Sequence, residues 1–98
     1  MDWIFDMTIP EVIKDWLLSL LRQGKYYVKT SDVETTLVMY GKEYCGVTHT
    51  PSTYSREWRK FRSDRSFRDI DIHNIEPIKD RSRQTTWMIT PDYSRIGT

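Results

Sequence analysis

The sequence has a single cysteine, Cys45, among 98 residues. One cysteine cannot form an intramolecular disulfide, so the fold must be held by packing, and a reducing compartment is expected. Long apolar runs are also missing, since none approaches the roughly 18 residues that cross a bilayer. The first six residues carry two aspartates and no basic residue, unlike a secretory signal. These absences predict a cytoplasmic protein that does not enter a membrane.

Sequence patterns for catalysis and metal binding are equally scarce. There is no glycine-rich phosphate loop, no nucleophile elbow, and no pairing of cysteine with histidine beside an orienting group. His49 follows Cys45 by four residues, but Gly46 intervenes and a structural zinc site takes four ligands. Asp69 and Asp71 have the spacing of one strand face, which can hold a cation but more often faces solvent. The sequence therefore predicts a protein that is not an enzyme and has no metal or cofactor.

The size and composition predict one domain with a modest core. A chain of 98 residues is long enough for one core and too short for two. Its apolar fraction of 38% is low, but thirteen tryptophan, tyrosine and phenylalanine residues supply large units of burial. We expect a single domain over residues 1–98, with its core between about 8 and 90 and a C-terminal tail of about 91–98.

The first helix is predicted over about residues 9–23. Apolar residues recur there at the helical period without a gap. Thr8 and Glu11 match the Ser/Thr-x-x-Glu capping box, and Pro10 suits the first turn. Gly24 is placed to end the helix. The apolar stripe of this helix is expected to form the main face of the core.

A short strand and a second helix are predicted next. Residues 25–30 include two tyrosines and a valine, which favour a strand. The second helix is expected to begin at Ser31, with Ser31 and Glu34 as its capping box. It either ends near Tyr40 or continues to Cys45 at the cost of one interior glycine.

The region 48–65 contains the most informative pattern in the chain. Thr50 followed by Pro51 is a strong signal for a helix start. Three aromatic residues then recur at spacings of four and three and so share one face: Tyr54, Trp58 and Phe61. We expect this face to be core, the alternative being rings that stack on single-stranded bases. The other faces carry Ser, Thr, Arg and Lys, and residues 54–68 hold six basic and two acidic residues.

The remainder of the chain predicts a hairpin. From Phe67 to His73 apolar and polar residues alternate, as in a half-buried strand. Pro77 is expected at a strand end or an edge bulge. Residues 79–84 are charged and loop-like, and residues 85–90 form the second strand, with Trp87 and Ile89 on one face.

This order of elements resembles the winged helix-turn-helix family over about residues 8–90. The best local match is Thr-Tyr-Ser-Arg-Glu-Trp-Arg-Lys-Phe at 53–61, which is similar to recognition helices of the form T-φ-S-R-x-φ-R-x-φ, where φ is apolar. Tyr, Trp and Phe replace the usual Val and Leu, and the second helix lacks the common Ala-rich, Gly-terminated form. The resemblance implies an α+β fold: a three-helix winged helix-turn-helix with a small antiparallel sheet and a β-hairpin wing.

The resemblance also implies sequence-selective binding of double-stranded DNA without catalysis. The helix over about 51–63 would enter the major groove, and the basic loop 79–84 would contact the flank. Arg56 is the candidate for reading a guanine, whereas Arg59, Lys60, Arg62 and Arg65 are expected on phosphates. The expected DNA-binding residues are Thr50, Ser52, Thr53, Ser55, Arg56, Arg59, Lys60, Arg62, Arg81 and Arg83. The function would be transcription regulation or recognition of a DNA site in a phage or mobile element, and no small-molecule ligand is expected.

The sequence is also consistent with other interpretations of the basic face and of the apolar residues. The basic face could be a solvated surface in which Glu57 and Asp64 make ion pairs. A winged-helix protein can also serve as a protein–protein adaptor in a larger assembly, which would leave an exposed apolar patch. A homodimer could form through the apolar N-terminal segment, which has no assigned place in the core: Trp3, Ile4 and Phe5.

Overall fold

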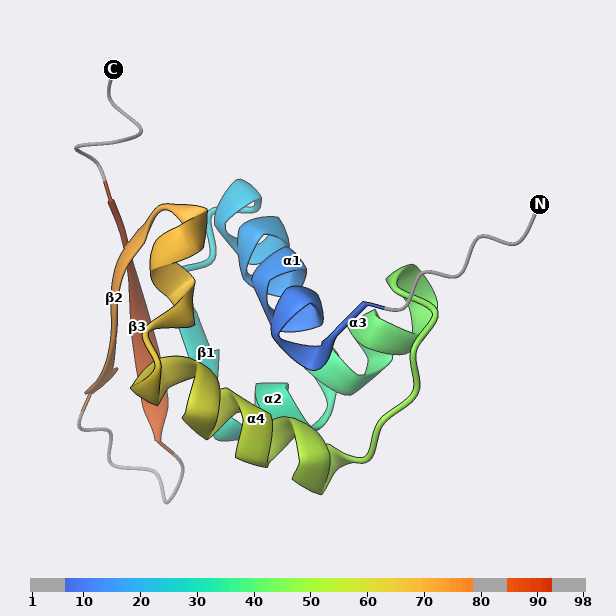
Figure 1. Cartoon of the computed structure of the whole chain (residues 1–98). Helices are drawn as coiled ribbons and strands as arrows, with labels where there is room; N and C mark the ends of the chain where they lie inside the picture. Colours follow the sequence, from blue (N-terminus) through green and yellow to red (C-terminus); the bar gives the residue numbers. More distant parts are fainter. Residues whose placement is uncertain (1–6, 79–84, 93–98) are drawn as a thin grey trace.

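The computed structural model describes residues 7–78 and 85–92 of the chain. It shows an α+β fold in which three strands lie side by side along one edge and the helices gather beside them (Figure 1). The elements, in chain order, are α1 (Ile9–Arg22), β1 (Tyr27–Lys29), α2 (Thr30–Glu34), α3 (Thr36–Tyr44), α4 (Pro51–Ser63), the 3₁₀ helix η1 (Ser66–Ile70), β2 (Ile72–Ile78) and β3 (Thr86–Pro91).

The helix α1 forms as the sequence predicts. The Glu11 N–H donates to the Thr8 hydroxyl at 3.3 Å, and the Thr8 N–H donates to the Glu11 carboxylate at 3.1 Å. This reciprocal capping box satisfies two N–H groups that a helix start leaves open. The helix ends at Arg22, and Gly24 follows with a positive φ of 75°. Its inner face is buried through Val12, Ile13, Trp16 and Leu17.

The predicted second helix is broken, and its predicted start is wrong. The cap is not the Ser31–Glu34 box; instead the backbone N–H of Lys29 donates to the Asp32 carboxylate at 2.9 Å. The helix is interrupted at Thr35, where φ is −123° and the hydroxyl donates to the Ser31 carbonyl oxygen at 2.7 Å. A threonine hydroxyl that bonds the preceding turn competes with regular helix geometry. The result is two helices, α2 and α3, in place of one.

The helix α3 runs through Gly41 and ends at Tyr44, so the longer of the two predicted ends is right. Gly41 is buried, and a Cβ atom at this position would overlap the Tyr54 hydroxyl oxygen of α4. The absence of a side chain therefore lets α3 and α4 approach closely. This contact offsets the propensity cost of a glycine inside a helix.

The strand predicted over 67–73 is wrong in its first half. Residues Ser66–Ile70 form η1, and β2 begins only at Ile72. Arg65 and Asp71 flank η1 with positive φ values of 53° and 61°, which turn the chain sharply at both ends. Asp69 and Asp71 therefore do not share a strand face. The Asp69 carboxylate instead lies 3.3 Å from the ammonium group of Lys14 on α1.

The three strands form an antiparallel sheet in the order β1-β3-β2. Val28 of β1 pairs with Trp87, and Ile75 of β2 pairs with Ile89. Within the described residues β2 pairs with β3 alone, so Pro77 lies on an edge strand, as expected of a residue without an N–H. The irregular register falls at residues 72–74 rather than at Pro77.

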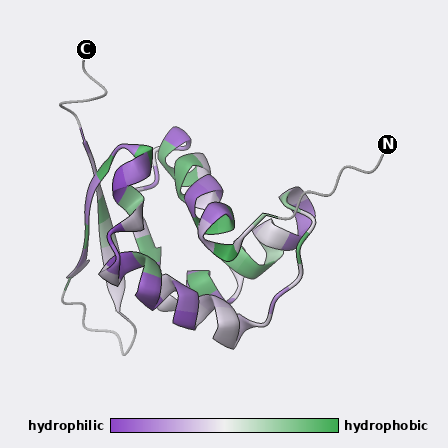
Figure 2. Cartoon of the chain, in the orientation of Figure 1, coloured by the Kyte–Doolittle hydropathy of each residue, from purple (hydrophilic) through white to green (hydrophobic). Residues whose placement is uncertain are grey.

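The aromatic face of α4 is core, as predicted. Tyr54, Trp58 and Phe61 are between 0% and 3% exposed. The Trp58 ring meets Trp16 of α1 and Trp87 of β3 edge-to-face, each with a centroid distance of 6.4 Å. One ring therefore ties α4 to both α1 and the sheet. In Figure 2, α4 is coloured largely purple and white, whereas α1 carries green hydrophobic stretches.

Candidate nucleic-acid interface

The start of α4 is held by a cluster of hydroxyl groups. The Thr50 side chain accepts the N–H of Thr53 at 3.3 Å, and Pro51 occupies the first turn. The Thr50 hydroxyl also lies 3.2 Å from the Ser52 hydroxyl and 2.8 Å from that of Thr53. Three of the predicted contact residues thus form one capping network, which fixes where the helix begins.

The face of α4 opposite its buried rings is basic. At about 100° per residue, Arg56, Arg59 and Lys60 point away from the core, and all three are exposed. No ion pair or hydrogen bond engages these three side chains within residues 7–78 and 85–92. The alternative in which Glu57 and Asp64 neutralise this face is not seen among the same residues. The outer face of α4 therefore presents three cations toward solvent.

Ser55 lies on the flank of α4 rather than on its outer face. Its hydroxyl donates to the Glu34 carboxylate at the end of α2, at 3.1 Å. The sequence predicts Ser55 as a DNA contact and Glu34 as part of a helix cap. The bond joins two residues that are 21 positions apart in the chain and lie on separate helices, α2 and α4.

Arg62 occupies a different environment from the other basic residues of α4. Its guanidinium carbon lies 3.7 Å from the centroid of the Trp87 ring and 5.8 Å from that of Trp58. Its Nε atom is buried and has no hydrogen-bond partner among the described residues. Burial, followed by the nearby charge of Arg59, lowers the pKa of Arg62. Arg62 thus links α4 to β3 through a cation–π contact, and its expected phosphate contact stays a prediction.

A hollow of about 260 Å³ lies between α2, α4 and the β3 strand. We call it the α2–α4 hollow. It is lined by Thr30, Val33, Glu34, Ser55, Trp58, Arg59, Arg62 and Trp87. Sequence reasoning missed the contributions of α2 and β3 to this site. Only the i, i+4 spacing of Trp58 and Arg62 on α4 gave a local signal for part of it.

The expected contacts from Arg81 and Arg83 lie outside the described residues. The strands that this loop joins are paired at their ends, where Ile78 lies opposite Thr86. The hairpin that carries the loop is therefore present as the sequence predicts.

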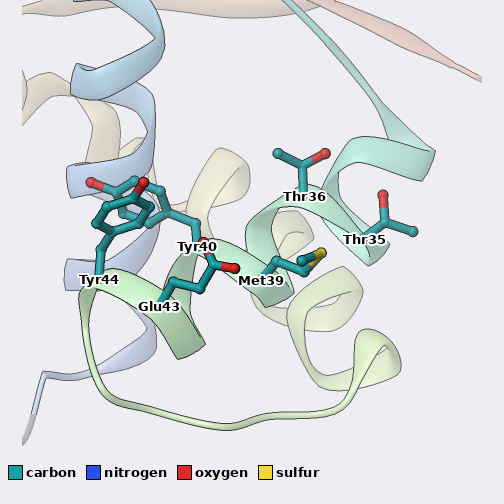
Figure 3. A pocket seen from close by; sticks show the side chains of 6 residues that line it. All are labelled: Thr35, Thr36, Met39, Tyr40, Glu43 and Tyr44. Atoms are coloured by element: carbon teal, nitrogen blue, oxygen red, sulfur yellow. The ribbon is translucent and has the colours of Figure 1, made fainter.

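A second surface lies on the outer side of α3. A hollow of about 330 Å³ is lined there by Thr35, Thr36, Met39, Tyr40, Glu43 and Tyr44 (Figure 3). Met39 is 58% exposed and Tyr44 is 72% exposed. The Tyr40 hydroxyl donates to the Asp15 carboxylate of α1 at 2.5 Å. Burial, together with this bond, raises the pKa of Tyr40 to about 12.

Neither a metal-ligand cluster nor a membrane-spanning helix is found in the described part of the chain. Cys45 is buried, and desolvation raises the pKa of its thiol. No protein-family model, curated protein or solved structure matches this sequence. The class that the fold itself defines is an α+β protein with a small three-stranded antiparallel sheet.

Proposed function

We propose that this protein is a winged helix-turn-helix protein that binds double-stranded DNA sequence-selectively and without catalysis. The observation that carries the proposal is the outer face of α4, where Arg56, Arg59 and Lys60 are exposed and lack acidic partners among the described residues. The thirteen residues of α4 make a helix of about 20 Å. An α-helix with its side chains is about 10–12 Å in diameter, which fits the major groove of B-DNA, about 12 Å wide.

The arrangement of the other elements supports the same function. A helix, a short strand and further helices precede a β2–β3 hairpin, and the sheet order is β1-β3-β2. This is compatible with a winged-helix arrangement in which α4 is the recognition helix and the hairpin is the wing. Trp58 packs on both α1 and β3, so α4 is held rigidly enough to dock as a unit.

The residues of α4 divide into separate roles in this proposal. Ser52 and Arg56, near the helix start, face base edges, with Arg56 donating two hydrogen bonds to a guanine. Arg59 and Lys60 contact phosphates and set the register. Thr50 positions the helix start through its capping bonds. In the wing loop, Arg81 and Arg83 contact the flanking backbone or minor groove.

The test is to measure the affinity of the full chain for duplex DNA by fluorescence anisotropy at several salt concentrations. We expect the logarithm of the affinity to fall with the logarithm of salt, with a slope set by roughly four to seven phosphate contacts. Lys60→Ala should reduce the magnitude of that slope by about one contact. The matched control is Lys42→Ala, an exposed lysine on α3, which should change neither slope nor affinity. Absence of salt-dependent binding to mixed-sequence duplex would reject the proposal.

A protein–protein adaptor is the second candidate, favoured by the exposed apolar surface of α3. Met39 and Tyr44 form a contiguous hollow with Tyr40, of the kind that receives an apolar segment of a partner protein. Stacking of single-stranded bases is not favoured, because the rings of Tyr54, Trp58 and Phe61 are buried.

The two candidate functions, DNA binding and protein–protein adaptor, differ in which substitutions abolish binding of the partner. Met39→Glu should leave duplex affinity unchanged if α4 binds DNA, since Met39 lies on α3. The adaptor is favoured if the wild-type chain does not bind duplex DNA but co-purifies with a protein partner, and if that partner is lost in Met39→Glu. The expected homodimer contact through residues 3–5 lies outside the described residues.

A further inference from the structure

The α2–α4 hollow has the chemistry of an oxyanion site. Two guanidinium groups, those of Arg59 and Arg62, border it from one helix. Thr30 and Ser55 also line it, and their hydroxyls donate to the Thr85 carbonyl oxygen at 3.3 Å and to the Glu34 carboxylate at 3.1 Å. Its volume of about 260 Å³ is below the usual range of about 300–1,000 Å³ for drug-sized ligands. It suits one phosphate with adjoining atoms.

Three N–H groups on the residues that line this hollow have no hydrogen-bond partner among the described residues. They are the Nε of Arg62 and the indole Nε1 atoms of Trp58 and Trp87, all buried. Buried donors are normally paired, and three of the five unpaired buried groups among the described residues belong to residues that line this one hollow, the other two being Trp16 Nε1 and the Tyr54 hydroxyl. An anion with several oxygens can accept from donors that point from different elements.

The position of Arg62 is already fixed before any ligand arrives. Its guanidinium is stacked on Trp87 at 3.7 Å, so little side-chain freedom remains to be lost on binding. Arg59 contributes a second positive charge close enough to disfavour that of Arg62. An anion between the two would relieve this repulsion.

We propose that the α2–α4 hollow binds a phosphate group, with Arg59 and Arg62 as its cationic partners. The inference rests on the proposed function only for the source of the phosphate, which is the backbone of a bound duplex or a free phosphorylated molecule. Glu34 is the one acidic residue in the lining, and its carboxylate accepts a hydrogen bond from the Ser55 hydroxyl. That bond turns the Ser55 proton toward α2 and leaves the two arginines to bind the anion.

The indole N–H signals of the full chain in a two-dimensional ¹H–¹⁵N NMR spectrum test the site directly. Inorganic phosphate is titrated at constant ionic strength with chloride as the compensating anion. We expect the Trp58 and Trp87 signals to shift saturably while the Trp16 signal stays in place, since Trp16 does not line the hollow. The site would be overturned if no saturable shift appeared up to about 50 mM phosphate. A dissociation constant of about 50 mM corresponds to a binding free energy of only about 2 kcal/mol in magnitude.

Variants separate the hollow from general charge attraction. Arg62→Gln and Arg59→Gln should each weaken phosphate affinity about tenfold, as expected for loss of one charge-assisted bond. Lys42→Gln removes one positive charge from the exposed side of α3, outside the hollow, and should leave the affinity unchanged. Equal weakening by Lys42→Gln and Arg59→Gln would contradict the proposal. Arg59→Gln keeps the test valid if Arg62→Gln perturbs folding, because Arg59 is exposed.

A duplex titration identifies the source of the phosphate. If the duplex shifts Trp87 and free phosphate competes for that shift, the DNA backbone occupies the hollow. If free phosphate shifts Trp87 but no duplex binds, the site stands with a small phosphorylated ligand, and the proposed DNA binding fails. If the duplex binds and neither ligand moves Trp87, the phosphate site is rejected and DNA binding is retained.

Discussion

Gly41 of α3 lies directly against the hydroxyl of Tyr54 on α4, and a single added carbon at Gly41 would overlap that oxygen. The Tyr54 side chain is fully buried, and its hydroxyl has no hydrogen-bond partner among the described residues. Val12 and Val47 complete the surroundings, each with a methyl group 3.4 Å from where a Cβ would lie. This contact sets how closely α4 packs against α3, and therefore how its basic outer face is presented.

Gly41→Ala should destabilise the protein by about 1–3 kcal/mol through overpacking. Helix propensity alone would favour alanine by about 1 kcal/mol, so destabilisation is evidence for the steric contact. In a Tyr54→Phe background the overlapping oxygen is gone, and the same substitution should become neutral or stabilising. Urea unfolding of the four proteins in this double-mutant cycle measures the coupling. An equal cost of Gly41→Ala in both backgrounds would refute a role for the Tyr54 hydroxyl.

Trp58→Ala should lower the free energy of unfolding by about 3–5 kcal/mol. The indole is 3% exposed and contacts rings of α1, α4 and β3, so its removal leaves a cavity where three elements meet. Arg56→Ala, an exposed site two residues earlier, is the control and should change stability by less than about 0.5 kcal/mol. Chemical denaturation monitored by circular dichroism gives both values. If Trp58→Ala had the same denaturation midpoint as the wild type, the Trp58 ring would be exposed and not buried.

Arg56→Ala should reduce the preference for the cognate site, by about 1–3 kcal/mol if its guanidinium reads a guanine. Lys60→Ala should instead weaken cognate and random duplexes alike, because a phosphate contact carries no sequence information. Both residues are exposed on the outer face of α4, so the comparison is not confounded by folding. Competition binding against random duplex measures the ratio. Equal losses on cognate and random DNA for both variants would refute this division of roles.

The stability of the protein should decline with pH above about 10 because of Tyr40. Burial and the bond to Asp15 raise the pKa of Tyr40 from 10.0 to about 12 in the folded state. Between these values the unfolded chain loses the phenolic proton first, so unfolding becomes progressively easier. Below pH 10 this contribution is fully present, and by about pH 12 it has been lost.

Urea midpoints measured from pH 8 to 11 should therefore fall less steeply for Tyr40→Phe than for the wild type. Some decline should remain in that variant, because burial also raises the pKa of Tyr54. Tyr27→Phe, an exposed ring on β1, should keep the wild-type dependence. Identical slopes for Tyr40→Phe and the wild type would show that the Tyr40–Asp15 bond does not affect stability in this range.

The sequence by itself determined the elements whose signals are local. The Thr8–Glu11 and Thr50–Pro51 signals fixed where α1 and α4 begin, because a cap acts within one turn of its own helix. The spacing of Tyr54, Trp58 and Phe61 fixed which side of α4 is core, and so which side is basic and exposed.

Only the tertiary structure decided the features that depend on contacts between distant segments. Alternation at 67–73 predicted a strand, but Ser66–Ile70 form a 3₁₀ helix that has left-handed residues at both ends and packs Phe67 against Phe61, and the strand begins only at Ile72. The bond between Ser55 and Glu34 joins residues of separate helices, and the stacking of Arg62 on Trp87 joins α4 to β3. No spacing rule reports such pairs, because they form when separate elements pack. The α2–α4 hollow is their product.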